Sequence, residues 1–159
     1  MAYIPEPAIE SIKRWEGLVD GDKIKPGLQP YRDPIGLWTI GYGHLISHNP
    51  RIPQPDMTLT MDEVDKLLRH DVQIYARSVR RLITTELTIL QYSALISFTF
   101  NVGGANLEAS TLRRVINRGD HQGVPKQFMR WVYAQGGIKL AGLIRRRRYE
   151  SNMYVEGTT

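Results

Sequence analysis

The chain has 159 residues, of which 42% are hydrophobic and 23% are charged, a composition that excludes an intrinsically disordered protein. It contains no cysteine, which excludes a disulfide scaffold, a cysteine nucleophile and a thiolate metal site. The formal net charge of +5 favours polyanionic partners, such as nucleic acid, anionic membranes or anionic envelope polymers.

The first predicted element is a helix over residues 5–16, in which Ile9, Ile12 and Trp15 recur at helical spacing. Glu16 is its last residue. The helix dipole is negative at this end, so the position is electrostatically unfavourable for a structural carboxylate. A catalytic acid, which must hold its proton, would benefit from it.

A small group of strands is predicted next, after a loop over residues 17–30 that is rich in glycine and proline. The sequence Asp33-Pro34-Ile35-Gly36 is typical of a type I turn. In the strand expected over 37–43, Thr39 faces away from the side that carries Trp38. We therefore expect two or three short strands.

Helices account for the rest of the chain. A capping box from Thr60 to Glu63 predicts a long helix that ends at about Leu82. A second box, from Thr88 to Gln91, begins a helix that is apolar nearly all round and should be buried. Glycines at 103 and 104 end it, and three further helices are expected at about 109–118, 122–135 and 140–154.

These elements predict a single α+β domain over residues 1–159 in which helices dominate. A small N-terminal β-lobe (about 17–59) is joined by a long helix (about 61–82) to a larger C-terminal helical lobe. The helical lobe comprises about residues 83–159 together with the N-terminal helix. A cleft between the lobes is the natural place for a ligand.

Two of the acidic residues can be read as a catalytic pair. Hydrolysis of a glycosidic bond requires an acid that protonates the leaving oxygen and a carboxylate that activates water or attacks directly. Glu16 and Asp33 could be that pair, and Thr39 could hold the water. Spacing alone supports this weakly, because the chain has 16 acidic residues.

Longer motifs carry a specific resemblance. The segments WEG and RDPIGLWTIGYGH resemble the signature of the phage-type lysozymes, a glycoside hydrolase family that includes many endolysins. Three more segments match the family's interlobe helix, its substrate-lining helix junction and its GLxxRRxxE element: LTMDEVDKLLRHDV, FTFNVGGANLEASTL and GLIRRRRYE. The resemblance covers nearly the whole chain. It implies a lysozyme-like fold and places the family's catalytic triad on Glu16, Asp33 and Thr39.

The resemblance also implies a reaction. It is hydrolysis of the β-1,4 bond between N-acetylmuramic acid and N-acetylglucosamine in peptidoglycan, usually with inversion, which leads to lysis of the cell. Glu16 would be the general acid, and Asp33 would activate a water that Thr39 positions. One departure is the loop at 19–29, which separates Glu16 from Asp33 more widely than is usual in the family. Its Asp20 and Asp22 are rival second carboxylates, and the loop could alter substrate subsites.

Further residues match family positions. His44 and Asp71 are expected to form an ion pair between the β-lobe and the interlobe helix. Arg146 would support catalysis near the acid glutamate, and Asn101 could hydrogen-bond an acetamido group. Packing is the alternative role for the residues expected to line the sugar cleft, which are Leu45, Phe100 and Thr111. No metal site is expected, because the histidines at 44 and 48 lie in HLISH and not in HExxH.

Alternative functions follow from the same features. A lytic transglycosylase would cut the same bond without water, and an inactive cationic protein would bind peptidoglycan without turnover. A specific nucleic-acid binder is disfavoured, because aromatic residues are not interleaved with the basic run at 145–148.

No cofactor is called for, and we expect a monomer. The N-terminal residues resemble neither a signal peptide nor a membrane anchor. We therefore expect the protein to accumulate in the host cytoplasm. By family habit, it would act on the bacterial cell wall after a separate protein has made a membrane lesion.

Overall fold

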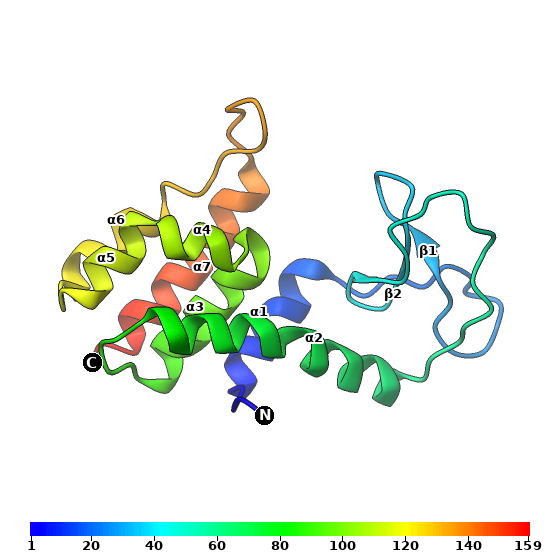
Figure 1. Ribbon diagram of the computed structural model, residues 1–159, viewed down its shortest axis with the longest axis horizontal. Helices are drawn as coiled ribbons and strands as arrows, with labels where there is room; N and C mark the ends of the chain where they lie inside the picture. Colours follow the sequence, from blue (N-terminus) through cyan, green and yellow to red (C-terminus); the bar gives the residue numbers. More distant parts are fainter. The chain divides into compact units, whose positions relative to one another are not determined.

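The computed structural model describes residues 1–159 as seven α-helices, one short 3₁₀ helix and a three-stranded sheet (Figure 1). The predicted α+β, mostly helical class is confirmed. The chain forms two compact units: the β-unit, residues 13–71, and the helical unit, residues 1–12 and 72–159. The boundaries between them fall within helix α1 (Glu6–Glu16) and helix α2 (Met61–Leu82). None of the helices combines the length and the apolar character that crossing a membrane requires.

The sheet of the β-unit is antiparallel, with the strand order β1-β2-β3. The predicted strand over 37–43 is shorter than expected. Gly41 and Gly43 have φ angles of 66° and 85°, which a strand cannot accommodate, so the chain turns between them toward the next strand. The bounds are β1 (Tyr31–Arg32), β2 (Trp38–Ile40) and β3 (His44–Leu45).

The register of the sheet aligns three side chains. Tyr31 of β1 lies opposite Thr39 of β2, and Thr39 lies opposite Leu45 of β3. Directly opposed residues of antiparallel strands point to the same face. Tyr31, Thr39 and Leu45 therefore form one row across the sheet, which we call the Tyr31–Leu45 row.

Both predicted capping boxes are present. The backbone N–H of Thr60 donates to Glu63 Oε2 at 2.7 Å, and the Glu63 N–H donates to Thr60 Oγ1 at 3.1 Å. The second box, Thr88 with Gln91, begins α3 (Ile89–Val102), which Gly103 ends at a φ of 90°. Both predicted helix ends, at Leu82 and before Gly103, are confirmed.

The helical unit is built around α3, whose central residues are buried and which packs most extensively against α7 (Ala141–Glu156). In Figure 1, α7 runs from orange to red alongside α3. The shorter elements are α4 (Gly104–Ala109), α5 (Thr111–Asn117), the 3₁₀ helix (His121–Gly123) and α6 (Val124–Phe128).

One helix prediction was wrong, and one helix was missed. The helix expected over 122–135 ends at Phe128, because the chain then folds into a narrow turn in which Ala134 N–H donates to Ile138 O at 2.7 Å. Two glycines with positive φ, Gly136 and Gly137, form the tip of that turn. Helix α4 was not predicted. Both Gly103 and Gly104 were expected to end α3, but only Gly103 leaves the helical conformation, and Gly104 begins α4.

Candidate active site

Asp33 and Thr39 are connected through the backbone of Leu37. The carboxylate oxygen Oδ1 of Asp33 accepts hydrogen bonds from the N–H groups of Ile35 at 3.0 Å and Leu37 at 2.8 Å. The N–H of Gly36 donates to the Asp33 carbonyl at 2.9 Å, which closes the predicted turn. The Thr39 hydroxyl donates to the carbonyl of Leu37 at 3.1 Å. The turn and the start of β2 thus orient both side chains.

This arrangement fixes what each group can still bind. The Thr39 hydroxyl proton is used by Leu37, so toward any further partner its oxygen is an acceptor. Both turn bonds of Asp33 fall on the same oxygen, Oδ1, and the turn makes no use of Oδ2. A water molecule beside these two side chains would therefore meet two acceptors.

Glu16 is the last residue of α1 and is exposed. The negative charges of Glu16 and Asp33 both raise the pKa of Tyr31. The pKa of the Tyr31 phenol is raised, first by burial and then by the negative charges of Glu16 and Asp33, while a hydrogen bond from the Gly43 backbone lowers it. Both carboxylates thus lie near one phenol. Sequence reasoning missed Tyr31, although its place two residues before Asp33 in a predicted strand region was a usable signal.

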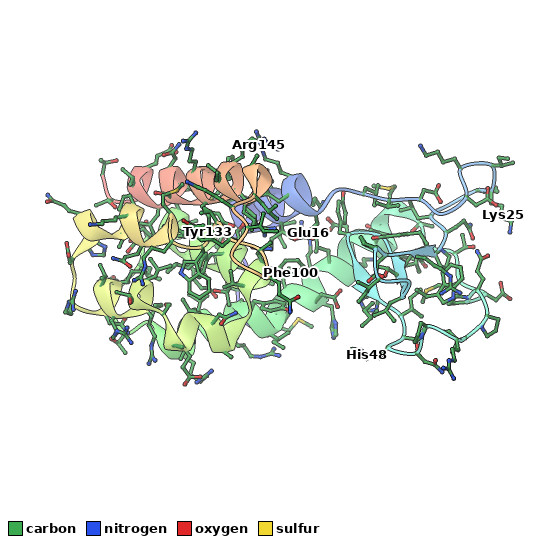
Figure 2. The ribbon with its side chains drawn as sticks, turned by 90° about the horizontal axis from the view of Figure 1, so that it is seen from above. Glu16, Lys25, His48, Phe100, Tyr133 and Arg145 are labelled. Atoms are coloured by element: carbon green, nitrogen blue, oxygen red, sulfur yellow. The ribbon has the colours of Figure 1, made fainter.

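The rival carboxylates stabilise their own loop. Asp20 Oδ1 accepts from the N–H groups of Asp22 at 3.1 Å and Gln29 at 3.0 Å. Asp22 Oδ1 accepts from the Ile24 N–H at 3.1 Å. Together these bonds close the loop over residues 19–29, at whose tip Lys25 projects in Figure 2. Their geometry gives both aspartates a structural role.

His44 and Asp71 are in direct contact, with 2.7 Å between Nδ1 and Oδ2, so they join β3 to α2 within the β-unit. A second histidine, His70, lies 3.7 Å from the other oxygen of Asp71 and is far more exposed. His48 lies in an exposed loop (Figure 2). The structure contains no cluster of three or more histidine, aspartate or glutamate side chains suited to a metal ion.

The other predicted ligand-binding residues are divided between the units. Leu45 ends the Tyr31–Leu45 row in the β-unit. In the helical unit, Phe100 is half-buried against Tyr75, with ring centroids 5.1 Å apart. The side-chain oxygen of Asn101 accepts from Arg147. Thr111 borders a hollow of about 230 Å³ whose other lining residues are Ala109, Ser110, Arg130 and Trp131.

Arg146 belongs to a buried ion cluster in the helical unit. Its Nε donates to Glu150 at 3.0 Å and its Nη2 donates to the Ser97 carbonyl at 3.0 Å. Arg147 is fully buried, donates to Glu150, and donates from Nε to the Trp131 carbonyl at 3.0 Å. Ser97 Oγ donates to Glu150 at 2.9 Å. The two arginines and the glutamate of the GLxxRRxxE motif thus form this buried cluster.

Sequence reasoning assigned no role to Arg147. The available signal was its place among Ile144, Ser151 and Tyr154 at spacings of three and four, the face of α7 that turns inward. Burial lowers the pKa of the Arg147 guanidinium, and the Glu150 carboxylate opposes that shift. The ion pair thus compensates a charge that would otherwise be costly in this core.

Comparisons with known proteins agree on one family. Residues 13–150 match the family model described as Phage lysozyme. An endolysin of Acyrthosiphon pisum secondary endosymbiont phage 1 is 34% identical over 155 residues, which cover 96% of this chain and 97% of that protein. A SAR-endolysin of Bacteriophage PS119 is 37% identical over 145 residues, which cover 88% of this chain and 84% of that protein.

Solved structures agree as well. The muramidase domain of SpmX from Asticaccaulis excentricus superposes with a TM-score of 0.80 and 32% identity, covering 98% of this chain and 99% of that domain. The lysozyme-like fold expected from the sequence motifs is confirmed. The chain belongs to the phage lysozyme family.

Proposed function

We propose that the protein is an endolysin-type muramidase that hydrolyses the β-1,4 bond between N-acetylmuramic acid and N-acetylglucosamine in bacterial peptidoglycan. The observation that carries the proposal is the hydrogen-bonded link from Asp33 through Leu37 to Thr39. In addition, the negative charges of Glu16 and Asp33 both raise the pKa of the Tyr31 phenol. Support also comes from the similar endolysins and from the muramidase domain.

In this proposal Glu16 is the general acid that protonates the leaving glycosidic oxygen. A catalytic water donates one hydrogen to Asp33 and the other to Thr39. Because the Thr39 hydroxyl proton is already used by the Leu37 carbonyl, Thr39 can serve this water only as an acceptor. The water oxygen then directs a lone pair at the anomeric carbon while Asp33 takes up its proton.

This role for Asp33 corresponds to an inverting reaction. Inversion requires carboxyl groups about 6.5–9.5 Å apart, so that a water fits between the second carboxylate and the sugar, whereas retention requires about 5–5.5 Å. The product would be the α-anomer of the reducing N-acetylmuramic acid. Proton NMR of the first products, before mutarotation, would detect it.

Sugar-contacting residues are proposed in each unit. Leu45 of the β-unit supplies an apolar contact at the end of the Tyr31–Leu45 row. In the helical unit, Phe100 and Thr111 supply an aromatic edge and a hydroxyl. Asn101 uses its side-chain oxygen for Arg147, so its amide nitrogen is the group offered to an acetamido carbonyl.

Arg146 is proposed as a support residue for the catalytic step, and Arg147 provides a matched comparison. Both guanidinium groups are buried and both pair with Glu150. If Arg146 supports catalysis, Arg146→Lys should lower turnover more than Arg147→Lys does, relative to the loss of stability of each variant. Equal turnover per folded molecule in the two variants would remove Arg146 from the proposal.

The choice of Asp33 over Asp20 gives the direct test. Asp33→Asn should abolish the release of soluble muropeptides while the protein stays folded, because the amide cannot accept the proton of the water. Asp20→Asn should remain active, although the loop at 19–29 is weakened. The reverse ranking would assign the second carboxylate to the loop.

The proposal also covers how the protein reaches its substrate. The protein meets peptidoglycan as a monomer after a separate protein has opened the membrane, so its activity is exerted on the cell wall.

A lytic transglycosylase is the second candidate. It needs no activated water, and the paired orientation of Asp33 and Thr39 favours hydrolysis over it.

A further inference from the structure

Arg147 connects two parts of the helical unit that are far apart in sequence. Its Nη2 donates to Oδ1 of Asn101 near the C-terminal end of α3, and its Nε donates to the Trp131 carbonyl at 3.0 Å. Trp131 is also a wall of the hollow that Thr111 borders. One guanidinium therefore holds Asn101 and a wall of that hollow together.

The guanidinium of Arg147 is itself fixed in place. The residue is fully buried, its Nη1 donates to Glu150 Oε2, and its guanidinium carbon lies 4.9 Å from the centre of the Phe98 ring. The group is planar and its N–H bonds point in set directions. Each partner of Arg147 must therefore accept from a direction that the protein has already chosen.

This contact decides how the side-chain amide of Asn101 is oriented. A guanidinium has five N–H donors and no acceptor. The amide must turn its carbonyl oxygen toward Arg147, because the reverse orientation would place its NH2 group against other N–H donors. Asn101 is an exposed residue, so the group that it offers outward is the NH2, which can only donate.

A donor with a fixed orientation distinguishes two chemical states of an amino sugar. An acetamido group presents a carbonyl oxygen, which accepts a hydrogen bond. The amino group of an N-deacetylated sugar is a donor instead, and it is positively charged when protonated. The Asn101 NH2 suits the first state and opposes the second. Glu150, the carboxylate that pairs with Arg147, is fully buried and is not available to such an ammonium group.

We propose that Arg147 is a positioning residue that makes the site selective for N-acetylated sugars, because it fixes the Asn101 amide with its NH2 group toward the substrate. The inference rests on the proposed muramidase function and on the proposed contact of Asn101 with an acetamido group. A lysine at 147 could keep the charge beside Glu150, but its single nitrogen could not hold Asn101 and Trp131 in the same geometry.

A matched pair of substrates tests the selectivity. Purified peptidoglycan is partly N-deacetylated by chemical treatment, and one portion of it is then re-acetylated with acetic anhydride. The selectivity is the ratio of kcat/KM on the re-acetylated portion to kcat/KM on the deacetylated portion. For the wild type it should be roughly 10-fold, as expected when one hydrogen bond is replaced by two opposed donors.

Asn101→Asp should remove most of that selectivity. One carboxylate oxygen of the aspartate still accepts from Arg147, so the variant keeps its contact and should fold, while the other oxygen can accept from a sugar ammonium. Asn106→Asp is the matched control, since it makes the same chemical change at an exposed asparagine of α4. It should keep the selectivity of the wild type.

Arg147→Lys tests the positioning role. It should lower the selectivity and raise KM for the re-acetylated substrate, with little change in kcat, because the Asn101 amide can then turn. A purely structural role would lower the free energy of unfolding and leave the selectivity of the folded molecules unchanged. Arg148→Lys, at an exposed arginine of the same helix, should change neither quantity.

The outcomes separate the two proposals. A wild type that releases no muropeptides from either substrate overturns the proposed function. An active wild type without selectivity, or an Asn101→Asp variant as selective as the wild type, overturns only this inference. If Asn101→Asp loses selectivity while folded Arg147→Lys keeps it, Arg147 does not set the specificity.

A measurement on the wild type alone does not depend on the folding of Arg147→Lys. NMR of the isotope-labelled protein should detect a coupling through the hydrogen bond between an Arg147 guanidinium nitrogen and the side-chain carbonyl carbon of Asn101. Absence of that coupling would contradict the orientation of the amide and overturn the role of Arg147.

Discussion

Asp33 and Thr39 are held together by a single residue between them: the Leu37 N–H donates to Asp33 at 2.8 Å, and the Leu37 carbonyl accepts from Thr39 at 3.1 Å. The six-residue step between the two side chains thus has a physical meaning. A turn of this length lets one peptide backbone orient a carboxylate and a hydroxyl at the same time. Lengthening or shortening the turn would separate them.

Thr39 can be tested by two replacements of similar size. Thr39→Ser keeps the acceptor oxygen and should retain most of the activity. Thr39→Val removes it and should lower kcat roughly 100-fold, because the catalytic water loses one of its two fixed contacts. It should also lower the free energy of unfolding by about 1 kcal/mol, since the Leu37 carbonyl loses its partner. Steady-state kinetics on purified peptidoglycan would contradict this account if Val and Ser behaved alike.

Asp71→Asn is expected to destabilise the β-unit, because it replaces the carboxylate that contacts His44 at 2.7 Å. The loss should be much smaller when His44 is replaced by Gln, because the two side chains contact each other directly. Thermal unfolding of the wild type, the two single variants and the double variant measures the difference. An Asp71→Asn loss of equal size with and without His44 would contradict the pairing.

His70 supplies the control for that experiment, because it also lies near Asp71 but at 3.7 Å and largely exposed. His70→Gln should leave the Asp71→Asn effect in place. His44→Gln should remove it. The opposite pattern would mean that His70 is the true partner of Asp71.

Asp65 gives a pH dependence with a defined sign. Hydrogen bonds from Arg69 and Lys13 hold the pKa of its carboxyl below the usual value. The folded state therefore binds the proton less readily than the unfolded state does. The resulting stability is present above the unfolded pKa of about 4 and is lost as the pH falls through the lower, folded value.

Asp65→Asn should accordingly lower the free energy of unfolding at pH 7 by about 1 kcal/mol, as expected for a partly exposed pair. The difference from the wild type should shrink as the pH falls below about 4. Chemical denaturation at several pH values measures it. A difference that grows toward low pH would show that the sign of the shift is wrong.

Glu150 should be among the residues most sensitive to substitution. It is fully buried and accepts hydrogen bonds from Arg146, Arg147 and Ser97. Glu150→Gln would remove the negative charge that two buried guanidinium groups share and should cost about 3–5 kcal/mol. Glu156→Gln, an exposed change on the same helix, should be nearly neutral. Similar melting temperatures for the two variants would contradict the ion cluster.

Sequence reasoning succeeded where contacts between residues close in sequence define the structure. The two capping boxes were correct because Thr60 with Glu63 and Thr88 with Gln91 satisfy backbone donors only three residues away. The end of α6 was missed, because it depends on a turn that pairs Val132 with Leu140 and closes only in the folded chain.

The candidate site shows the same division. The turn at Asp33 was predicted correctly, because it is closed locally by the bond from the Gly36 N–H to the Asp33 carbonyl. The assignment of Asp33 and Thr39 as catalytic residues came from the family resemblance and stays a prediction. Arg147 was missed because its partners Asn101 and Trp131 lie 46 and 16 positions away.

The central claim is that Glu16 is the acid of a hydrolytic muramidase. The most direct test is digestion of purified peptidoglycan with the wild type, Glu16→Gln and Glu10→Gln, followed by mass spectrometry of the soluble fragments. Glu10 is an exposed glutamate on the same helix and serves as the control. We predict fragments that end in reducing N-acetylmuramic acid from the wild type and Glu10→Gln, and none from Glu16→Gln. Fragments lighter by one water, ending in anhydro-muramic acid, or undiminished release by Glu16→Gln would contradict the account.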